Sequence, residues 1–174
     1  MAIAALLLAG LAAPAWAQAT GEGLDLRETL AGVLAYTRWP VPPDPLRLCF
    51  AGTSPHAERL QQQGFSWSGS PPVLLRKLEP GVPVATQCDA LYLGALGAAQ
   101  WQQLTDELDG QPVLTLCERS TPCLASGMVR MDIDAAGRQV RFEINLDAVA
   151  RGTVRIHPQV LRLGHRGIPQ ERKP

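Results

Sequence analysis

Apolar residues recur at helical spacing in three long stretches of the chain, and each stretch predicts an amphipathic helix. The first begins at Leu24 and ends before Pro40, because proline cannot continue a helix. The second follows a capping residue, Thr53 or Ser54, and ends at Gly64. The predicted helices cover residues 24–39, 56–64 and 98–110, with two shorter ones at 146–152 and 159–164.

Short apolar runs between these helices predict strands, and the run that begins at Leu46 is expected to be a buried strand. The runs cover residues 46–52, 72–78, 89–96 and 111–118. Residues 127–147 have a different pattern, in which apolar and polar residues alternate on both sides of a turn at 135–137. This pattern predicts an antiparallel hairpin with one buried face, formed by Val129, Met131, Ile133, Val140, Phe142 and Ile144.

The alternation of strands and helices favours an α/β fold. We expect a three-layer α/β/α sandwich with a mixed, partly parallel sheet and a C-terminal antiparallel hairpin. No internal repeat or linker divides the chain, so residues 24–165 are predicted to form a single domain. Residues 166–174 are predicted to be a polar tail.

The net charge and the apolar content of the chain exclude some classes of protein. The 174 residues include 16 Lys+Arg and 16 Asp+Glu, so the formal net charge is zero. A neutral chain without a basic run lacks the charge with which proteins bind phosphate backbones, and nucleic acid is therefore not expected as a partner. With 46% hydrophobic and 18% charged residues, the chain is also too apolar to be disordered.

The N-terminal residues indicate export. An apolar run from Ala2 to Ala13 precedes Ala15-Trp16-Ala17, a small-x-small cleavage pattern. We interpret residues 1–17 as a signal peptide, cleaved after Ala17 or Ala19, that sends the protein to the periplasm. The run is shorter than the ~20 apolar residues that span a bilayer, so membrane insertion is not expected. Since no Lys or Arg precedes Arg27, an N-terminal core helix is the alternative.

Export favours disulfide bonds among the four cysteines, because disulfides form and persist in an oxidising compartment. Four cysteines allow three pairings. Cys117 and Cys123 flank a loop and can close a short ring, which leaves Cys49 with Cys88. The x₅ spacing between Cys117 and Cys123 fits neither a Cys₄ zinc site nor a thioredoxin-like C-x-x-C motif.

Catalytic motifs do not emerge from the sequence. His56, His157 and His165 have no metal-ligand spacing, and no nucleophile elbow, phosphate-binding loop or calcium loop is found. We therefore expect no catalytic residues, no cofactor and no metal.

Trp67 lies in a predicted loop and is either a core residue or an exposed anchor for a partner or small ligand. Arg155 and His157 point the same way if residues 154–158 are extended, and Glu143 on the hairpin could pair with them. This group is either an ion pair that pins the last helix to the sheet or a partner-binding surface.

Several of these segments together are similar to the YfiR-like family of exported proteins. The most specific is Val140–Gly164, where R-F-E-I-N-L-D is followed by R-I-H-P. The other matching segments are 46–52, 88–96, 110–116 and 127–129, and the resemblance covers residues 24–163.

The resemblance implies a homodimeric, non-catalytic regulator that binds the periplasmic part of an inner-membrane diguanylate cyclase of the YfiN type and keeps cyclic-di-GMP and biofilm formation low. It also implies that Cys49 and Cys88 form the long-range disulfide of the family. Residues 128–131 contain no cysteine where the family resemblance places a partner for the second bridge, so Cys117 takes that role and a redox function is open. A periplasmic solute-binding module that uses the Trp67 loop is the alternative function.

Overall fold

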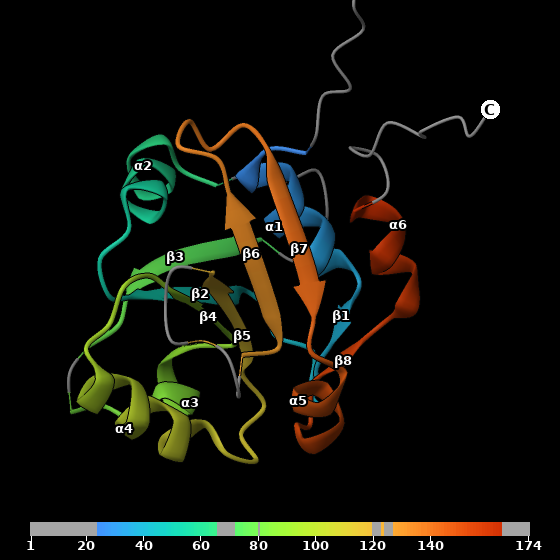
Figure 1. Ribbon diagram of the computed structural model, residues 1–174. Coiled ribbons are helices and arrows are strands. Elements are labelled where there is room, and N and C mark those ends of the chain that lie inside the picture. The colour runs from blue at the N-terminus through green and yellow to red at the C-terminus, as the bar shows by residue number, and fades with distance from the viewer. Residues whose placement is uncertain (1–23, 66–71, 80, 120–122, 124–126, 165–174) are drawn as a thin grey trace, which may run out of the picture.

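The structure is a computed structural model that describes residues 24–65, 72–79, 81–119, 123 and 127–164. Six strands form its central sheet: β2 (Leu46–Ala51), β3 (Val73–Lys77), β4 (Ala90–Leu93), β5 (Leu114–Glu118), β6 (Val129–Ile133) and β7 (Val140–Ile144). Their order is β3-β2-β4-β5-β6-β7, parallel from β3 to β6 and antiparallel between β6 and β7 (Figure 1). The predicted mixed, partly parallel sheet is confirmed.

The central strands are buried on both faces, which explains their continuous apolar sequences. All four residues of β4 are buried. Ala90 and Tyr92 contribute to one apolar core, whereas Leu91 and Leu93 contribute to a second core across the sheet. Because successive side chains of a strand point to opposite faces, each central strand supports two helical layers.

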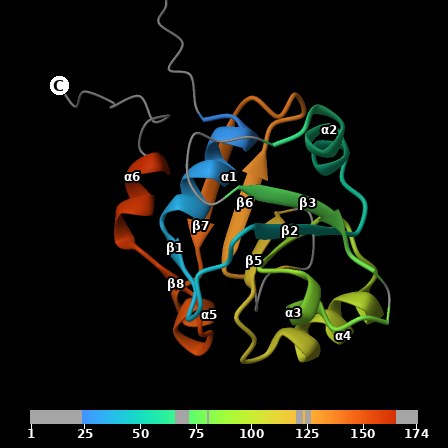
Figure 2. The ribbon, with the colours of Figure 1, turned by 180° about the vertical axis from the view of Figure 1, so that it is seen from behind.

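Helices α1 (Leu26–Ala35) and α2 (Pro55–Gln63) cover the first face. Figure 2 shows α1 in front of β6 and β7 when the molecule is seen from behind. A capping box between Asp25 and Glu28 starts α1, and Ser54 caps α2 by accepting from the Ala57 N–H at 3.0 Å. The predicted amphipathic helices are therefore present, and Ser54 is the capping residue.

The first helix ends earlier than predicted. Its last residue is Ala35, and Thr37–Arg38 form strand β1, which pairs with strand β8 (Arg155–Ile156). The prediction that the helix continues to Pro40 is wrong, because pairing with a distant segment outweighs the local helical pattern. The Thr37 hydroxyl donates to the Val33 carbonyl at 2.7 Å, which helps to end the helix.

Helices α3 (Val84–Gln87) and α4 (Ala98–Leu108) cover the second face over β2, β4 and β5. The apolar stripe of α4 packs there through Trp101, Leu104 and Leu108. The sequence analysis does not predict α3, which has only four residues and no side-chain cap.

The chain from the hairpin onward follows the prediction closely. β6 and β7 pair with Met131 opposite Phe142, and Gly137 at the turn has a φ of 72°, which favours glycine. Helix α5 (Leu146–Arg151) follows, and after β8 come a 3₁₀ turn (Pro158–Val160) and helix α6 (Leu161–Gly164).

The predicted signal peptide, residues 1–17, and the predicted tail, residues 166–174, lie outside the described residues. Within the part that is described, no helix has the length and hydrophobicity needed to cross a membrane. The described residues from 24 onward form a six-stranded and a two-stranded sheet with two apolar cores.

Two disulfides cross-link the second core. Cys49 is bonded to Cys88 and Cys117 to Cys123, with Cα–Cα distances of 5.7 and 6.1 Å. All four cysteines are buried. The first disulfide joins β2 to the end of α3 across 39 residues of sequence, whereas the second closes a ring of 6.

We expect loss of Cys49–Cys88 to destabilise the protein more than loss of Cys117–Cys123. Constraint of the unfolded chain is worth about 4 kcal/mol for the longer loop and about 2.4 kcal/mol for the shorter one. The double variants Cys49→Ala/Cys88→Ala and Cys117→Ala/Cys123→Ala are a matched pair, because all four sites are buried. The first is expected to unfold about 3–6 °C below the second.

Thermal unfolding followed by circular dichroism measures both midpoints. Equal losses in the two variants would contradict the chain-entropy account and assign the stabilisation to packing of the sulfur atoms instead.

Candidate partner-binding surface

The two-stranded sheet β1–β8 brings together segments that lie far apart in the sequence. Thr37 pairs with Ile156 and Arg38 with Arg155. Thr37 is buried and Ile156 packs against the first core, while both arginines are exposed. The small sheet therefore fixes two cationic side chains next to each other on the surface.

His157 lies beside these two arginines and extends the exposed polar group. Its backbone N–H donates to the Tyr36 carbonyl at 2.8 Å, and its ring stacks on Tyr36 with centroids 6.3 Å apart. Its Nδ1 accepts from the Gln159 N–H at 3.2 Å, so the neutral ring carries its proton on Nε2. The histidine is thus held in one orientation while it remains exposed.

The two guanidinium groups are held by backbone carbonyls. Arg38 Nη1 donates to the carbonyls of Ala35 and Thr37 at 2.7 and 2.8 Å. Arg155 Nη1 donates to the Gly152 carbonyl at 2.6 Å. Among the described residues no carboxylate forms an ion pair with either arginine. We call Arg38, Arg155 and His157 the basic ribbon.

Like charges directly opposite each other in a sheet are unfavourable. A favourable free-energy term must therefore stabilise the pairing of β1 with β8, which places Arg38 opposite Arg155. Burial of the apolar neighbours of the ribbon supplies that term. The ribbon is left with positive charge that an acidic partner surface would neutralise.

Glu143 does not join the basic ribbon. Its carboxylate pairs with Arg119 at 3.2 Å and with Arg130 at 3.0 Å. Arg119 also lies 3.5 Å from Asp132. The expected pairing with Arg155 or His157 is therefore not the one that the structure contains, because these residues lie on opposite sides of the sheet.

Strand alternation explains this placement. Val140, Phe142 and Ile144 of β7 face the first core, where Ile156 also packs, and Glu143 points the other way. We call Arg119, Arg130, Asp132 and Glu143 the charged face. Arg119, Asp132 and Glu143 are exposed and Arg130 is partly buried.

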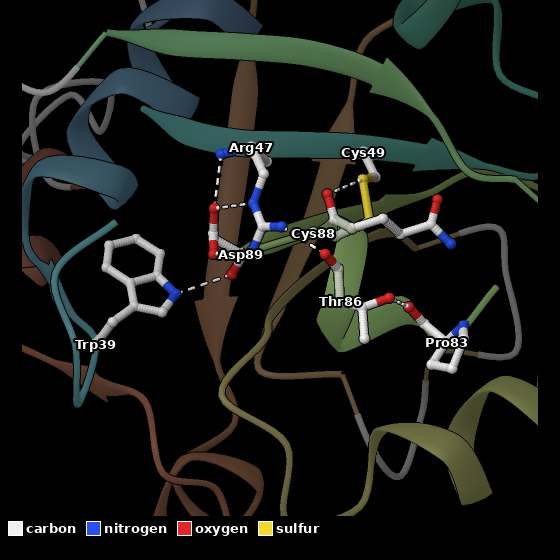
Figure 3. Close-up of polar contacts among 8 residues, drawn as sticks. Trp39, Arg47, Cys49, Pro83, Thr86, Cys88 and Asp89 are labelled. Carbon is white, nitrogen blue, oxygen red and sulfur yellow. Dashed lines mark hydrogen bonds and ion pairs between the residues drawn. A yellow bond between two sulfur atoms is a disulfide. The ribbon is translucent and has the colours of Figure 1, made fainter. Parts of the chain in front are cut away.

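The tryptophans differ in their roles. Trp67 lies outside the described residues. Trp39 packs against the first core, and its indole N–H donates to the Asp89 carbonyl at 2.8 Å (Figure 3). Trp101 packs against the second core. Trp39 and Trp101 therefore both contribute to packing.

Asp89 also binds Arg47 with both carboxylate oxygens, at 2.9 Å from Nε and 2.7 Å from Nη2 (Figure 3). Arg47 Nη1 donates further to the Thr86 carbonyl at 2.6 Å. The hydrogen bond with Asp89 raises the pKa of the guanidinium above its usual value. Beside the Cys49–Cys88 disulfide, this pair ties β2 to the start of β4.

The carboxyl ends of β2 and β4 are where parallel sheets with this strand order usually hold a ligand. Here the backbone closes that crevice. Thr53 and Ala95 exchange two hydrogen bonds of 2.9 and 2.8 Å. Gly94 permits the approach, since a Cβ there would lie 2.5 Å from the Thr53 carbonyl oxygen.

Polar side chains beside this closed crevice form hydrogen bonds with one another. Tyr92 donates its hydroxyl hydrogen to Glu118 Oε1 at 2.6 Å, and Ser54 donates to the same oxygen. Burial raises the pKa of Tyr92, and the charge of Glu118 raises it further, so the phenol remains a donor. This cluster links the start of α2 to the end of β5.

A cavity of about 460 Å³ lies between α4, β5 and α5. Its apolar wall includes Trp101, Leu104, Val113 and Met128. Cavities of this size accept small molecules. Within the described residues, no group of three or more His, Cys, Asp or Glu side chains is arranged to hold a metal ion.

Sequence reasoning identified Arg155 and His157 but missed Arg38, Arg119 and Arg130. The helical pattern of the first segment includes Arg38, so it gives no sign that this residue pairs with β8. The alternation of Arg130 with buried neighbours in β6 was a usable signal, since it places this residue on the same face as Glu143.

A comparison with protein families agrees with the sequence resemblance. The sequence model of the DUF4154 family, described as YfiR/HmsC-like, matches residues 27–165. The match covers well over half of the chain and includes all strands of the sheet and the basic ribbon. The chain therefore belongs to the YfiR/HmsC-like family.

Proposed function

We propose that the protein is a periplasmic regulator that binds and represses the periplasmic part of an inner-membrane diguanylate cyclase of the YfiN type. It acts as a homodimer and keeps cyclic-di-GMP, and with it biofilm formation, low. Family membership supports a regulator of this kind. The observation that carries the proposal is the basic ribbon, an ordered and exposed group in which Arg155 and His157 belong to Val140–Gly164, the segment where the resemblance is most specific.

Repression of this kind needs no active site. A protein shifts a membrane receptor between two states only by binding one state more tightly than the other. A rigid surface that is already ordered before binding loses little entropy in the complex. The backbone hydrogen bonds of Arg38 and Arg155, and the contacts of His157, provide such rigidity.

A solute-binding function is the second candidate, and the 460 Å³ cavity under α4 favours it. Trp67, on which this hypothesis first depended, lies outside the described residues. A gene for a GGDEF-domain membrane protein beside this one favours the regulator, whereas a transporter gene favours the solute binder.

Substitution of the basic ribbon is expected to release the cyclase. Arg38→Gln and His157→Ala each remove an exposed group that is worth about 0–1 kcal/mol to folding, whereas loss of a desolvated interface contact costs about 2–5 kcal/mol in binding. Cyclic-di-GMP and biofilm are expected to rise, while the thermal midpoint and the dimeric mass stay unchanged.

Arg76→Gln is the matched control, because Arg76 is exposed on β3 at the far edge of the sheet. It removes the same charge and is expected to leave repression intact. A ribbon variant that still represses fully, or a loss of repression only together with unfolding, would contradict the proposal.

Glu143 is proposed to contribute to repression from the charged face. Glu143→Gln weakens two ion pairs at once and frees Arg119 and Arg130 to change orientation. Since the carboxylate is 54% exposed, we expect a stability loss below about 1 kcal/mol. Repression is expected to fall, as measured by cellular cyclic-di-GMP.

Asp132→Asn is the control on the same face, because among the described residues Asp132 forms an ion pair with Arg119 only. Full repression by the Glu143 variant, or equal defects in both variants, would remove Glu143 from the partner-binding surface and leave it a structural role.

A further inference from the structure

We infer that a cavity at the tip of the β6–β7 hairpin binds a small oxyanion, such as phosphate or a phosphoryl group. The cavity has a volume of about 300 Å³ and lies between the hairpin tip, the start of α1 and helix α2. Four of its lining residues are basic: Arg27, His56, Arg59 and Arg138. It is separate from the basic ribbon and from the charged face, and we call it the basic cavity.

Three segments are fixed to one another around the basic cavity. Arg59 Nη1 donates to the Ala136 carbonyl of the hairpin tip at 2.7 Å. Leu26 N–H donates to the Gly137 carbonyl at 3.3 Å, which ties the same tip to α1. The tip lies beside α2 and the start of α1 in both views (Figures 1 and 2). The wall is thus built by tertiary contacts and not by one mobile surface loop.

The positive charge of the wall is neutralised only in part within the described residues. Arg27, Arg59 and Arg138 take part in no ion pair there, and Arg27 donates only to the neutral amide of Gln63, at 3.3 Å. Asp25 is the acidic residue of the wall, and its carboxylate accepts the Glu28 N–H at 2.8 Å as the cap of α1. A cluster with this excess of positive charge attracts an anion locally, although the whole chain is neutral.

The turn residue Asp134 lowers this potential only in part. Its carboxylate accepts the backbone N–H groups of Arg138 and Gln139 at 2.7 and 3.1 Å. These hydrogen bonds order the hairpin tip and direct the carboxylate into the turn. The Arg138 side chain remains part of the cavity wall.

His56 closes one side of the basic cavity. Its Nδ1 is shielded from solvent and has no hydrogen-bond partner among the described residues, so this nitrogen is not counted among the donors to an anion in the cavity. Gly137 allows the tip to approach, since a Cβ there would lie 3.3 Å from both His56 Nδ1 and Arg59 Nη1.

The chemistry of these donors selects the ligand class. Guanidinium groups bind phosphate and related oxyanions through two parallel N–H···O bonds. A tetrahedral oxyanion offers acceptors in several directions, which suits donors that arrive from α1, α2 and the hairpin. The cavity volume suits a small ion or a single phosphoryl group.

Titration calorimetry of the full mature protein with inorganic phosphate at constant ionic strength tests the inference. We expect saturable binding with one site per chain. Arg59→Gln and Arg138→Gln are each expected to weaken binding by about tenfold or more, since each removes a charge-assisted donor. Arg76→Gln, on the far strand β3, is expected to bind phosphate like the unchanged protein.

Absence of saturable binding at millimolar phosphate, or unchanged affinity in both Arg59→Gln and Arg138→Gln, would overturn the inference. Arg138→Gln keeps the test valid if loss of the Arg59–Ala136 contact disturbs the fold, which the thermal midpoint reports. Vesicles of phosphatidylglycerol and of phosphatidylcholine distinguish the sources of the phosphoryl group. Retention by the former that Arg59→Gln abolishes assigns a lipid headgroup, and binding of free phosphate without retention assigns a soluble ligand.

Discussion

The antiparallel pairing of β1 with β8 holds the beginning and the end of the described chain together, and the proposed binding surface depends on it. The pairing consists of two residue pairs, one of which places Arg38 opposite Arg155. Such a like-charge pair costs up to about 1 kcal/mol. The fully buried Val154 next to β8 contributes about 1.5–3 kcal/mol, so burial outweighs the repulsion. The fold can therefore keep two cations side by side on its surface.

Burial also determines where the charged side chains of the sheet lie. The central strands are buried on both faces and carry almost no charge, whereas the described residues cover only one face of β6 and β7. Their other face carries Arg130, Asp132 and Glu143, which pair among themselves and with Arg119. A chain with zero net charge thus presents one cationic surface and one surface of mixed charge. Charges arranged in this way orient a bound partner and fix its register, and they do not attract partners non-specifically.

Much of this fold was predictable, because burial on two faces leaves a clear signature. The apolar runs of β2, β4 and β5 and the alternation of β6 and β7 identified the sheet. β1 was not predictable, since a strand of two residues has no periodicity and Thr37 continues a helical pattern. Helix α3 was not predictable for the same reason, since its four residues are too few to show a helical periodicity. Alternation placed Glu143 on an outer face, but the sequence does not say which segments lie across it, and its real partners come from β6 and the end of β5.

Capture of an integral membrane protein tests the central claim most directly. Tagged mature protein is mixed with solubilised inner membranes, and the bound integral proteins are identified by mass spectrometry. The account predicts a protein with a GGDEF domain, bound by the unchanged chain and by Arg76→Gln but lost with Arg38→Gln. Capture of transport proteins, or equal capture of the cyclase by all three chains, would contradict it.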